Sequence, residues 1–267
     1  MGILNITPDS FSDGGSLFDG APRSDAVLRR AENMIDQGAN ILDIGGESTR
    51  PGATPVSEQE ELERVIPTLD LLQANFDIPI SVDTSSPAVM REAISYGVDM
   101  INDVRALGRE GAIEAVADSD TSICLMHMSD EPPSMQQQTR YRDVTEDVKD
   151  FLASRVAACT AAGIKGHRLC IDPGFGFGKT TEQNVELLAG LPKLQQLGLP
   201  MLVGFSRKSI IGKITGRPVK ERVFGSVSLA LLALERVATI LRVHDVGPTS
   251  DMLKIWLALA KIENREV

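Results

Sequence analysis

The feature that most constrains the fold of this chain is a regular alternation of short apolar runs with longer segments of helical periodicity. Eight runs of strand type recur along the 267 residues, at 3–6, 41–44, 78–82, 100–104, 123–126, 169–171, 201–203 and 240–243. The segments between them carry apolar residues at helical spacing, for example in 25–37, 57–73, 87–95, 146–162 and 251–262. Strand runs that alternate with helices predict βαβ units and a parallel sheet.

The number and spacing of these units predict how the sheet is arranged. Eight strand–helix units in a chain of this length average about 33 residues each, which is the size that a (β/α)8 barrel requires. No Pro- or Ser-rich linker divides the chain, so we expect an α/β fold in which residues 1–267 form a single-domain (β/α)8 TIM barrel. A doubly wound open sheet is the alternative, because periodicity alone does not reveal whether a sheet closes.

Helix boundaries carry capping signals. Ser24 and Ser57 are the predicted N-caps of the first two helices, and Glu60 follows Ser57 at the spacing of a capping box. Glycines follow several helical segments, as is typical of helix C-termini.

Polar side chains follow the apolar runs directly. They are Asn5, Asp43 with Glu47, Asp83, Asn102 with Asp103, His127, Asp172, Ser206 and His244. In a barrel of parallel strands the carboxyl ends share one rim, where such enzymes have their sites. A helix cap explains a polar residue at any single position equally well, but its recurrence after every run indicates a functional rim.

Two carboxylates and one amide among them predict a ligand rich in N–H donors. Asp83, Asn102 and Asp172 are flanked by apolar residues, and such groups need partners when they are buried. A flat ligand would satisfy them, because a carboxylate accepts two parallel hydrogen bonds from an N–C–N edge. A glycosidase pair of carboxylates is the alternative, although one Trp and two Tyr provide little of the aromatic platform that sugars need.

A second group of side chains is cationic and predicts an anion site. It comprises Arg50, Arg207, Lys208, Arg242 and His244. The loops after the seventh and eighth strands form the usual phosphate site of a (β/α)8 barrel. Arg242 lies among apolar neighbours and is a strong candidate, whereas Arg207 is expected to be a solvated loop residue.

The sequence lacks the motifs of several other common kinds of site. The glycine-rich stretch 172–180 has Pro173 where a P-loop needs its first glycine, so we interpret its glycines as allowing the backbone to turn beside a ligand. No H-x-x-x-H or H-E-x-x-H pattern indicates zinc, and no G-x-S-x-G pattern indicates a serine hydrolase. A Mg²⁺ ion shared between a protein oxygen and phosphates would leave a weaker trace, such as Asn5 alone.

The composition disfavours several classes of protein. With 27 basic and 37 acidic residues the net charge is −10, so nucleic acid is a poor candidate partner. The longest apolar stretches end well short of the roughly 20 residues that a membrane helix needs, and the first residues lack a secretory signal. Three cysteines without a C-x-x-C pair fit a reducing compartment, and we expect a cytoplasmic protein.

At these residues the chain resembles the dihydropteroate synthase family. The matching blocks are MGILNITPDSFSDGG at 1–15, DIGGESTRPG at 43–52, SVDT at 81–84, IND at 101–103, MHM at 126–128, DPGFGFGK at 172–179, SRKS at 206–209 and RVHD at 242–245. Eight blocks in order, each beside a strand-type run, make a specific match that spans nearly the whole chain.

The resemblance implies a (β/α)8 transferase of folate synthesis that joins 6-hydroxymethyl-7,8-dihydropterin diphosphate to p-aminobenzoate, forming 7,8-dihydropteroate and diphosphate. By the resemblance, the pterin is held by Asp83, Asn102, Met126, Asp172, Phe177 and Lys208. The diphosphate is bound by Asn5, Thr49, Arg242 and His244, and Asn5 is the ligand of a Mg²⁺ cofactor. The p-aminobenzoate pocket is formed by Phe11, Thr49, Arg50, Pro51 and Ser206. The residues implied in catalysis are Asp83, Asp172, Lys208, Arg242 and His244.

The resemblance also carries expectations about mechanism and assembly. Reaction through a pterin cation is expected, with Asp83 and Asp172 stabilising its charge. The last helices, over 227–234 and 252–259, are apolar on more than one face and are expected to form a homodimer, although packing against the barrel explains part of that pattern. The chain is expected to lack the short N-terminal extension usual in the family. A pterin-binding methyltransferase domain and a non-catalytic pterin-binding module are the alternative functions.

Overall fold

The structure is a computed structural model that describes residues 1–7, 17, 22–48, 56–129 and 141–263. Six parallel strands form one sheet in the order β1 to β6. These strands are β1 (Gly2–Asn5), β2 (Leu42–Gly45), β3 (Ile80–Asp83), β4 (Met100–Asp103), β5 (Ser122–Met126) and β6 (Leu169–Asp172). A second parallel pair consists of β7 (Leu202–Val203) and β8 (Ile240–Leu241).

Single bridges join the two sheets into a closed ring. Gly2 pairs with Val243 after β8, and Ile171 of β6 pairs with Met201 before β7. Backbone hydrogen bonds run across both joins, from Ile3 N to the Val243 carbonyl and from Ile171 N to the Pro200 carbonyl, each 3.0 Å long. The predicted (β/α)8 barrel is therefore confirmed, and the open-sheet alternative is wrong.

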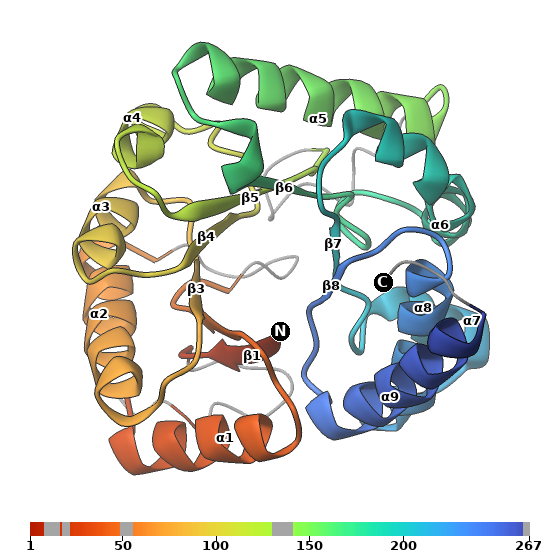
Figure 1. Ribbon diagram of the computed structural model, residues 1–267, viewed down its shortest axis with the longest axis horizontal. Helices are drawn as coiled ribbons and strands as arrows, with labels where there is room; N and C mark the ends of the chain where they lie inside the picture. The colour runs from red at the N-terminus through yellow and green to blue at the C-terminus, as the bar shows by residue number, and fades with distance from the viewer. Residues whose placement is uncertain (8–16, 18–21, 49–55, 130–140, 264–267) are drawn as a thin grey trace.

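Helices surround the strands as an outer ring (Figure 1). In chain order they are α1 (Ser24–Asp36), α2 (Glu58–Asn75), α3 (Pro87–Ser95), α4 (Ala112–Ala117), α5 (Val144–Ala161), α6 (Thr181–Leu194), α7 (Ser209–Thr215), α8 (Val223–Leu234) and α9 (Val246–Ile262). Three short 3-10 turns, η2 (Gly166–Arg168), η3 (Gln195–Leu197) and η4 (Val219–Glu221), lie between them. Among the described residues, no helix is long and apolar enough to cross a membrane.

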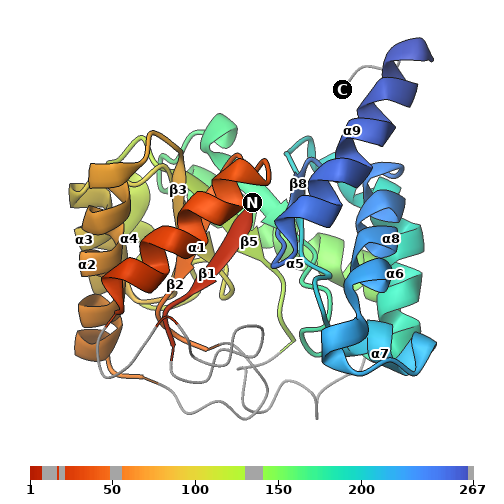
Figure 2. The same cartoon turned by 90° about the horizontal axis from the view of Figure 1, so that it is seen from below.

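The sequences of the strands are short apolar runs because both faces of each strand are buried. The main core lies between strands and helices, where Leu4, Ile44, Val82 and Ile101 have no exposed surface. A smaller cluster, Met100, Cys124, Cys170 and Leu202, packs separately. Seen from the side in Figure 2, α9 continues beyond the other helices.

Of the two N-caps predicted for the first two helices, one is confirmed and one is wrong. Ser57 and Glu60 form the predicted capping box, in which Ser57 Oγ accepts from Glu60 N at 3.3 Å and Glu60 Oε2 accepts from Ser57 N at 3.1 Å. Ser24 is wrong as an N-cap, because α1 already includes Ser24 and its N-cap is Arg23, which makes no side-chain capping bond.

Candidate active site

Three of the predicted polar side chains stand in one row across the first four strands. Asn5 pairs in register with Gly45, Gly45 with Asp83, and Asp83 with Asn102. A Cβ on Gly45 would lie 3.5 Å from Asn5 Oδ1 and 4.0 Å from Asp83 Oδ2, so the glycine leaves room between them. The parallel register thus brings an amide, a carboxylate and a second amide to the same rim, as predicted.

Arg242 reaches this row from β8, the strand beside β1 in the closed ring. It directly follows β8, and its guanidinium donates from Nε to Asp43 Oδ2 and from Nη2 to Asp83 Oδ2, both at 2.6 Å. Burial lowers the pKa of Arg242 and the carboxylates of Asp43 and Asp83 raise it, with a net rise. Burial raises the pKa of Asp83 to about 7, and Arg242 opposes that rise.

Asp43 is a site residue to which the sequence analysis assigned no role. Its side chain is fully buried on β2 and holds one edge of the Arg242 guanidinium. The signal was available, since Asp43 is a charged residue within an apolar run, but its partner is 199 positions away in the chain.

Asp172 lies at the end of β6, opposite Met126 of β5 in the sheet register. Its Oδ1 accepts the backbone N–H of Gly174 at 2.7 Å, which orients the carboxylate. Burial raises the pKa of Asp172, and the nearby Lys208 opposes that rise. The second predicted carboxylate is thus buried and oriented at the same rim.

Lys208 meets the loop after β6 from the loop after β7. Its Nζ donates to the carbonyl of Phe175 and lies 4.6 Å from the centre of the Phe177 ring. Burial lowers the pKa of Lys208 to about 8, and Asp172 acts in the opposite direction. Phe177 and Lys208, which come from different motifs, are therefore in contact.

His244 and Ser206 form a pair beside Arg242. Ser206 Oγ accepts the backbone N–H of His244 at 3.1 Å and lies 3.0 Å from His244 Nδ1. Burial lowers the pKa of His244 to about 3, with Arg242 and Arg207 adding to the effect, so the imidazole is neutral at pH 7. When the Ser206 proton is donated to Nδ1, the imidazole carries its own proton on Nε2.

The expectation of a solvated Arg207 is wrong. Arg207 pairs with Asp245, from Nε to Oδ2 at 2.9 Å and from Nη2 to Oδ1 at 2.6 Å, and its backbone has a positive φ of 58°. Its backbone N–H also donates to Ser226 Oγ of α8 at 2.9 Å. The pair was missed because Asp245 follows a different strand.

The remaining predicted residues cannot be placed. Phe11, Thr49, Arg50 and Pro51 lie outside the described residues, so their part of the p-aminobenzoate pocket stays a prediction. Within the described part of the chain, no group of three His, Cys, Asp or Glu side chains is arranged to hold a metal ion.

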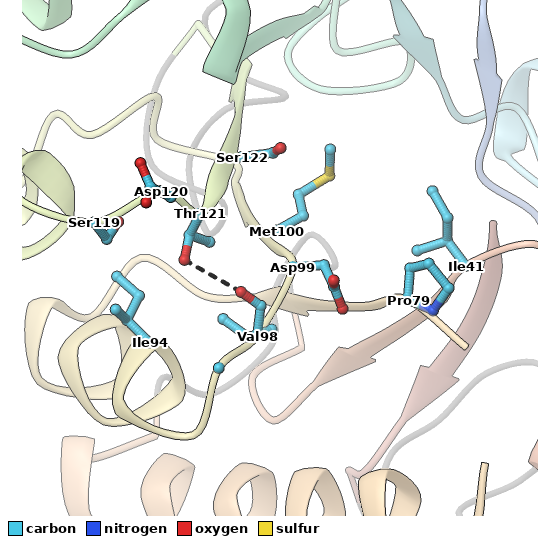
Figure 3. A pocket seen from close by; sticks show the side chains of 11 residues that line it. Ile41, Pro79, Ile94, Val98, Asp99, Met100, Ser119, Asp120, Thr121 and Ser122 are labelled. Carbon is cyan, nitrogen blue, oxygen red and sulfur yellow. Dashed lines mark hydrogen bonds between the residues drawn. The ribbon is translucent and has the colours of Figure 1, made fainter. Parts of the chain in front are cut away.

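A cavity lies at the other end of the barrel. It has a volume of about 750 Å³ and is lined at the amino ends of β3, β4 and β5 by residues such as Pro79, Asp99 and Ser122 (Figure 3). Asp99 already accepts the Ile80 backbone N–H at 2.8 Å. Two carboxylates and no cationic side chain line this cavity, so it is a poor site for an anionic substrate.

The fold and the rim together define a class of protein: a (β/α)8 barrel enzyme whose site combines buried carboxylates for N–H donors with a cationic group for an anion. The chain belongs to the pterin binding enzyme family, whose sequence profile matches residues 1–244.

Relatives in this family are similar over nearly their whole length. The dihydropteroate synthase of Haemophilus influenzae is 50% identical over 260 residues, which cover 97% of this chain and 93% of the relative. A crystal structure of Yersinia pestis dihydropteroate synthase with a sulfonamide drug complex has a TM-score of 0.93 at 47% identity and covers 97% of this chain and 93% of its own. The Burkholderia cenocepacia enzyme complexed with 7,8-dihydropteroate has a TM-score of 0.88 at 48% identity, with coverages of 98% and 91%.

Proposed function

We propose that this chain has dihydropteroate synthase activity, joining 6-hydroxymethyl-7,8-dihydropterin diphosphate to p-aminobenzoate with release of diphosphate. The observation that carries the proposal is the part-buried guanidinium of Arg242 between Asp43 and Asp83, on the same rim as Asp172 and Lys208. This rim offers acceptors for an N–H-rich ring and donors for an anion. The family is that of pterin binding enzymes, its relatives include dihydropteroate synthases, and the structure of one relative is a complex with 7,8-dihydropteroate.

We assign recognition of the pterin to Asp172, Asn102 and Lys208. The carboxylate of Asp172, oriented by Gly174 N–H, is suited to accept two hydrogen bonds from the N–C–N edge of the pterin. Asn102 is buried in the row beside Asp83 and can both donate and accept. Lys208 supplies a cation for the carbonyl side of the ring, with Met126 and Phe177 packing beside it.

We assign binding of the leaving diphosphate to Arg242, His244 and Asn5, with Thr49 as an untested fourth residue. The two carboxylates engage Nε and Nη2 of Arg242, and the other guanidinium donors are assigned to the substrate. The imidazole of His244 is neutral because burial lowers its pKa to about 3, and it contributes an Nε2–H donor in the tautomer in which Ser206 donates to Nδ1. Stabilising charge on the diphosphate lowers the barrier to its departure.

We propose Mg²⁺ as the cofactor, with Asn5 as its protein ligand. The fit rests on a hard oxygen donor, because Asn5 Oδ1 faces the room that Gly45 leaves, 3.5 Å from the position that a Cβ would occupy there. A single protein ligand suits an ion that is bound mainly by substrate phosphates. When bound, Mg²⁺ would neutralise part of the diphosphate charge.

The reaction then needs no covalent enzyme intermediate. The amine nitrogen of p-aminobenzoate forms a bond to the exocyclic methylene carbon of the pterin, the bond from that carbon to the diphosphate oxygen breaks, and the amine proton is lost to water. The electron pair of the broken bond leaves with diphosphate. Asp83 and Asp172 would stabilise positive charge that develops on the pterin. The p-aminobenzoate pocket is assigned to Phe11, Thr49, Arg50, Pro51 and Ser206.

The proposal is tested by mixing the protein with Mg²⁺, dihydropterin diphosphate and p-aminobenzoate and measuring both products. We expect diphosphate and 7,8-dihydropteroate in equal amounts. When p-aminobenzoate is withheld, we expect no 7,8-dihydropteroate. A pterin-binding module would bind the pterin without releasing diphosphate. A methyltransferase domain would bind a pterin but would not form dihydropteroate, and either result would contradict the proposal.

We also propose a homodimer through the last helices. Among the described residues, seven of the nine exposed large apolar side chains lie on α7, α8 and α9, and they are Ile214, Phe224, Leu232, Ile255, Leu257, Leu259 and Ile262. Phe224 is 86% exposed, which is unusual for a phenylalanine in a monomer. A second copy of the chain, with the same apolar face, would cover this surface.

A further inference from the structure

The loop after β6 depends on side-chain hydrogen bonds to keep its conformation. Between Asp172 and Thr180 it contains three glycines with positive φ, Gly174 at 69°, Gly176 at 82° and Gly178 at 63°. Glycine reaches such angles at little cost, but it also gives a loop many other conformations. The loop presents the Phe175 carbonyl and the Phe177 ring to Lys208, so its conformation decides where Lys208 lies.

Lys179 belongs to this loop, and its buried side chain binds carbonyl groups of the loop itself. Its Nζ has three acceptors, the Gly174 carbonyl at 2.8 Å, the Phe177 carbonyl at 3.1 Å and His127 Nδ1 at 3.0 Å. The ammonium form has three donors, so these contacts match it in number. Burial lowers the pKa of Lys179 to about 7, and Asp172 opposes that fall. The side chain is only 3% exposed, and water cannot replace the contacts without rearrangement of the loop.

His127 fixes the other end of this contact. Its ring packs edge-on against Phe151, with 5.0 Å between ring centres, and lies near Tyr141 at 5.9 Å. Burial lowers the pKa of His127 to about 2, and Lys179 adds to the effect, so the imidazole is neutral. Its Nδ1 accepts from Lys179 Nζ in the tautomer that carries the ring proton on Nε2. Tyr141 Oη also donates to the Gly178 carbonyl at 3.1 Å, so the loop is held from two sides.

We infer that Lys179, anchored by His127, is a positioning residue for pterin binding, which shapes the loop after β6 so that Lys208 meets the substrate. The inference deepens the proposed function and rests on it. The loop carbonyls on either side of Phe175 are bound by Lys179, while the Phe175 carbonyl itself is bound by Lys208. The two lysines therefore bind different carbonyls of one short peptide, and Lys179 acts on the pterin through Lys208.

The test is a double-substitution cycle with Lys179→Met and Lys208→Ala, read out as the Kd of dihydropterin diphosphate and the KM of each substrate. Methionine keeps the length of the lysine and removes its three donors. We expect Lys179→Met to weaken pterin binding at least tenfold and to change the KM of p-aminobenzoate less than twofold. In the Lys208→Ala background the same substitution should weaken binding less than threefold, because the residue through which it acts is gone.

The matched control is Lys165→Met, which removes an exposed lysine before η2 and should leave both constants unchanged. If Lys179→Met does not fold, His127→Phe replaces it, since phenylalanine preserves the ring against Phe151 and removes the Nδ1 acceptor. His127→Phe should weaken pterin binding several-fold.

Three outcomes would overturn the inference: an unchanged pterin Kd, an equal loss of affinity for both substrates, or full additivity of Lys179→Met with Lys208→Ala. Failure of the proposed function would be seen separately, because the wild-type protein itself would then not bind dihydropterin diphosphate or release diphosphate.

Discussion

At the scale of single residues, the strand-end positions were predictable and their partners were not. Asp83, Asn102 and Asp172 could be placed on one rim, since each follows an apolar run of a parallel sheet. The sequence does not reveal that Arg242 spans Asp43 and Asp83, or that Lys179 meets His127 across 52 positions. The contacts of Arg242 depend on the ring closing between β8 and β1, and the contact of Lys179 depends on β5 pairing with β6; no local pattern records either.

Replacement of Lys208 by alanine should impair pterin binding and turnover. Loss of one charge-assisted hydrogen bond costs about 1.5–3 kcal/mol, which corresponds to a KM for dihydropterin diphosphate raised roughly 10- to 100-fold. Steady-state kinetics with p-aminobenzoate at saturation measure this constant. Lys213→Ala removes an exposed lysine of α7 and serves as the control. Wild-type kinetics in Lys208→Ala would remove Lys208 from the site.

At the scale of helices and strands, capping signals were reliable only where the side chain and its partner are three residues apart. Ser57 and Glu60 form their box, because both members lie in one turn. Ser24 was wrong by one position, since packing decides where α1 begins and Ser24 already has helical backbone. Buried charge on helices was not predicted at all, as with Glu61 on α2.

Removal of the Ser57 cap should destabilise the protein measurably. Ser57→Ala deletes the oxygen that accepts the Glu60 backbone N–H, and the loss of such a cap costs about 1 kcal/mol of unfolding free energy. Ser24→Ala is the matched control, because Ser24 caps nothing, and it should cost clearly less. Chemical denaturation of both variants measures the difference, and equal losses would contradict the capping assignment.

Glu61 should make stability depend on pH. Burial raises the pKa of Glu61 from 4.5 to about 7, so between these values the folded protein holds a proton that the unfolded chain has lost. Wild-type stability therefore falls, through this group, as pH rises from about 4.5 to 7. Relative to wild type, Glu61→Gln should gain up to about 3 kcal/mol between pH 5 and pH 8.

The measurement is chemical denaturation of wild type and Glu61→Gln at both pH values. The difference between the two proteins cancels other titrating groups, which include His127 and His244. Glu63→Gln changes an exposed carboxyl of the same helix and is the control. A difference between Glu61→Gln and wild type that does not change with pH would show that the buried carboxyl of Glu61 is not the cause.

At the scale of the whole molecule, closure of the barrel and the apolar face of the last helices are the two features that matter. Closure rests on bridges at Gly2–Val243 and Ile171–Met201. The first of these bridges pairs segments from the two ends of the chain. The apolar face was anticipated from the composition of the last helices. Only the structure shows which of their side chains remain outside, such as Phe224 and Ile255.

A charge on this face should separate the proposed homodimer. Phe224→Glu would bring repelling carboxylates together in a symmetric interface. We expect this variant to be a monomer in sedimentation velocity and wild type to be a dimer. Val185→Glu, on the half-exposed surface of α6, is the control and should leave the dimer intact. A wild-type monomer at micromolar concentration would contradict the homodimer.

The sequence by itself determined the alternation of strands and helices and the polar residues that end the strands, because both are local features. The resemblance of its motifs to a known family indicated the closed barrel and the reaction. The tertiary structure alone decided the partners at that rim: Arg242 with Asp43 and Asp83, Lys208 with the loop after β6, and Lys179 with His127. The physical reason is that burial makes each charged or polar group find a partner, and the closed ring, rather than proximity in the chain, determines which partner is within reach.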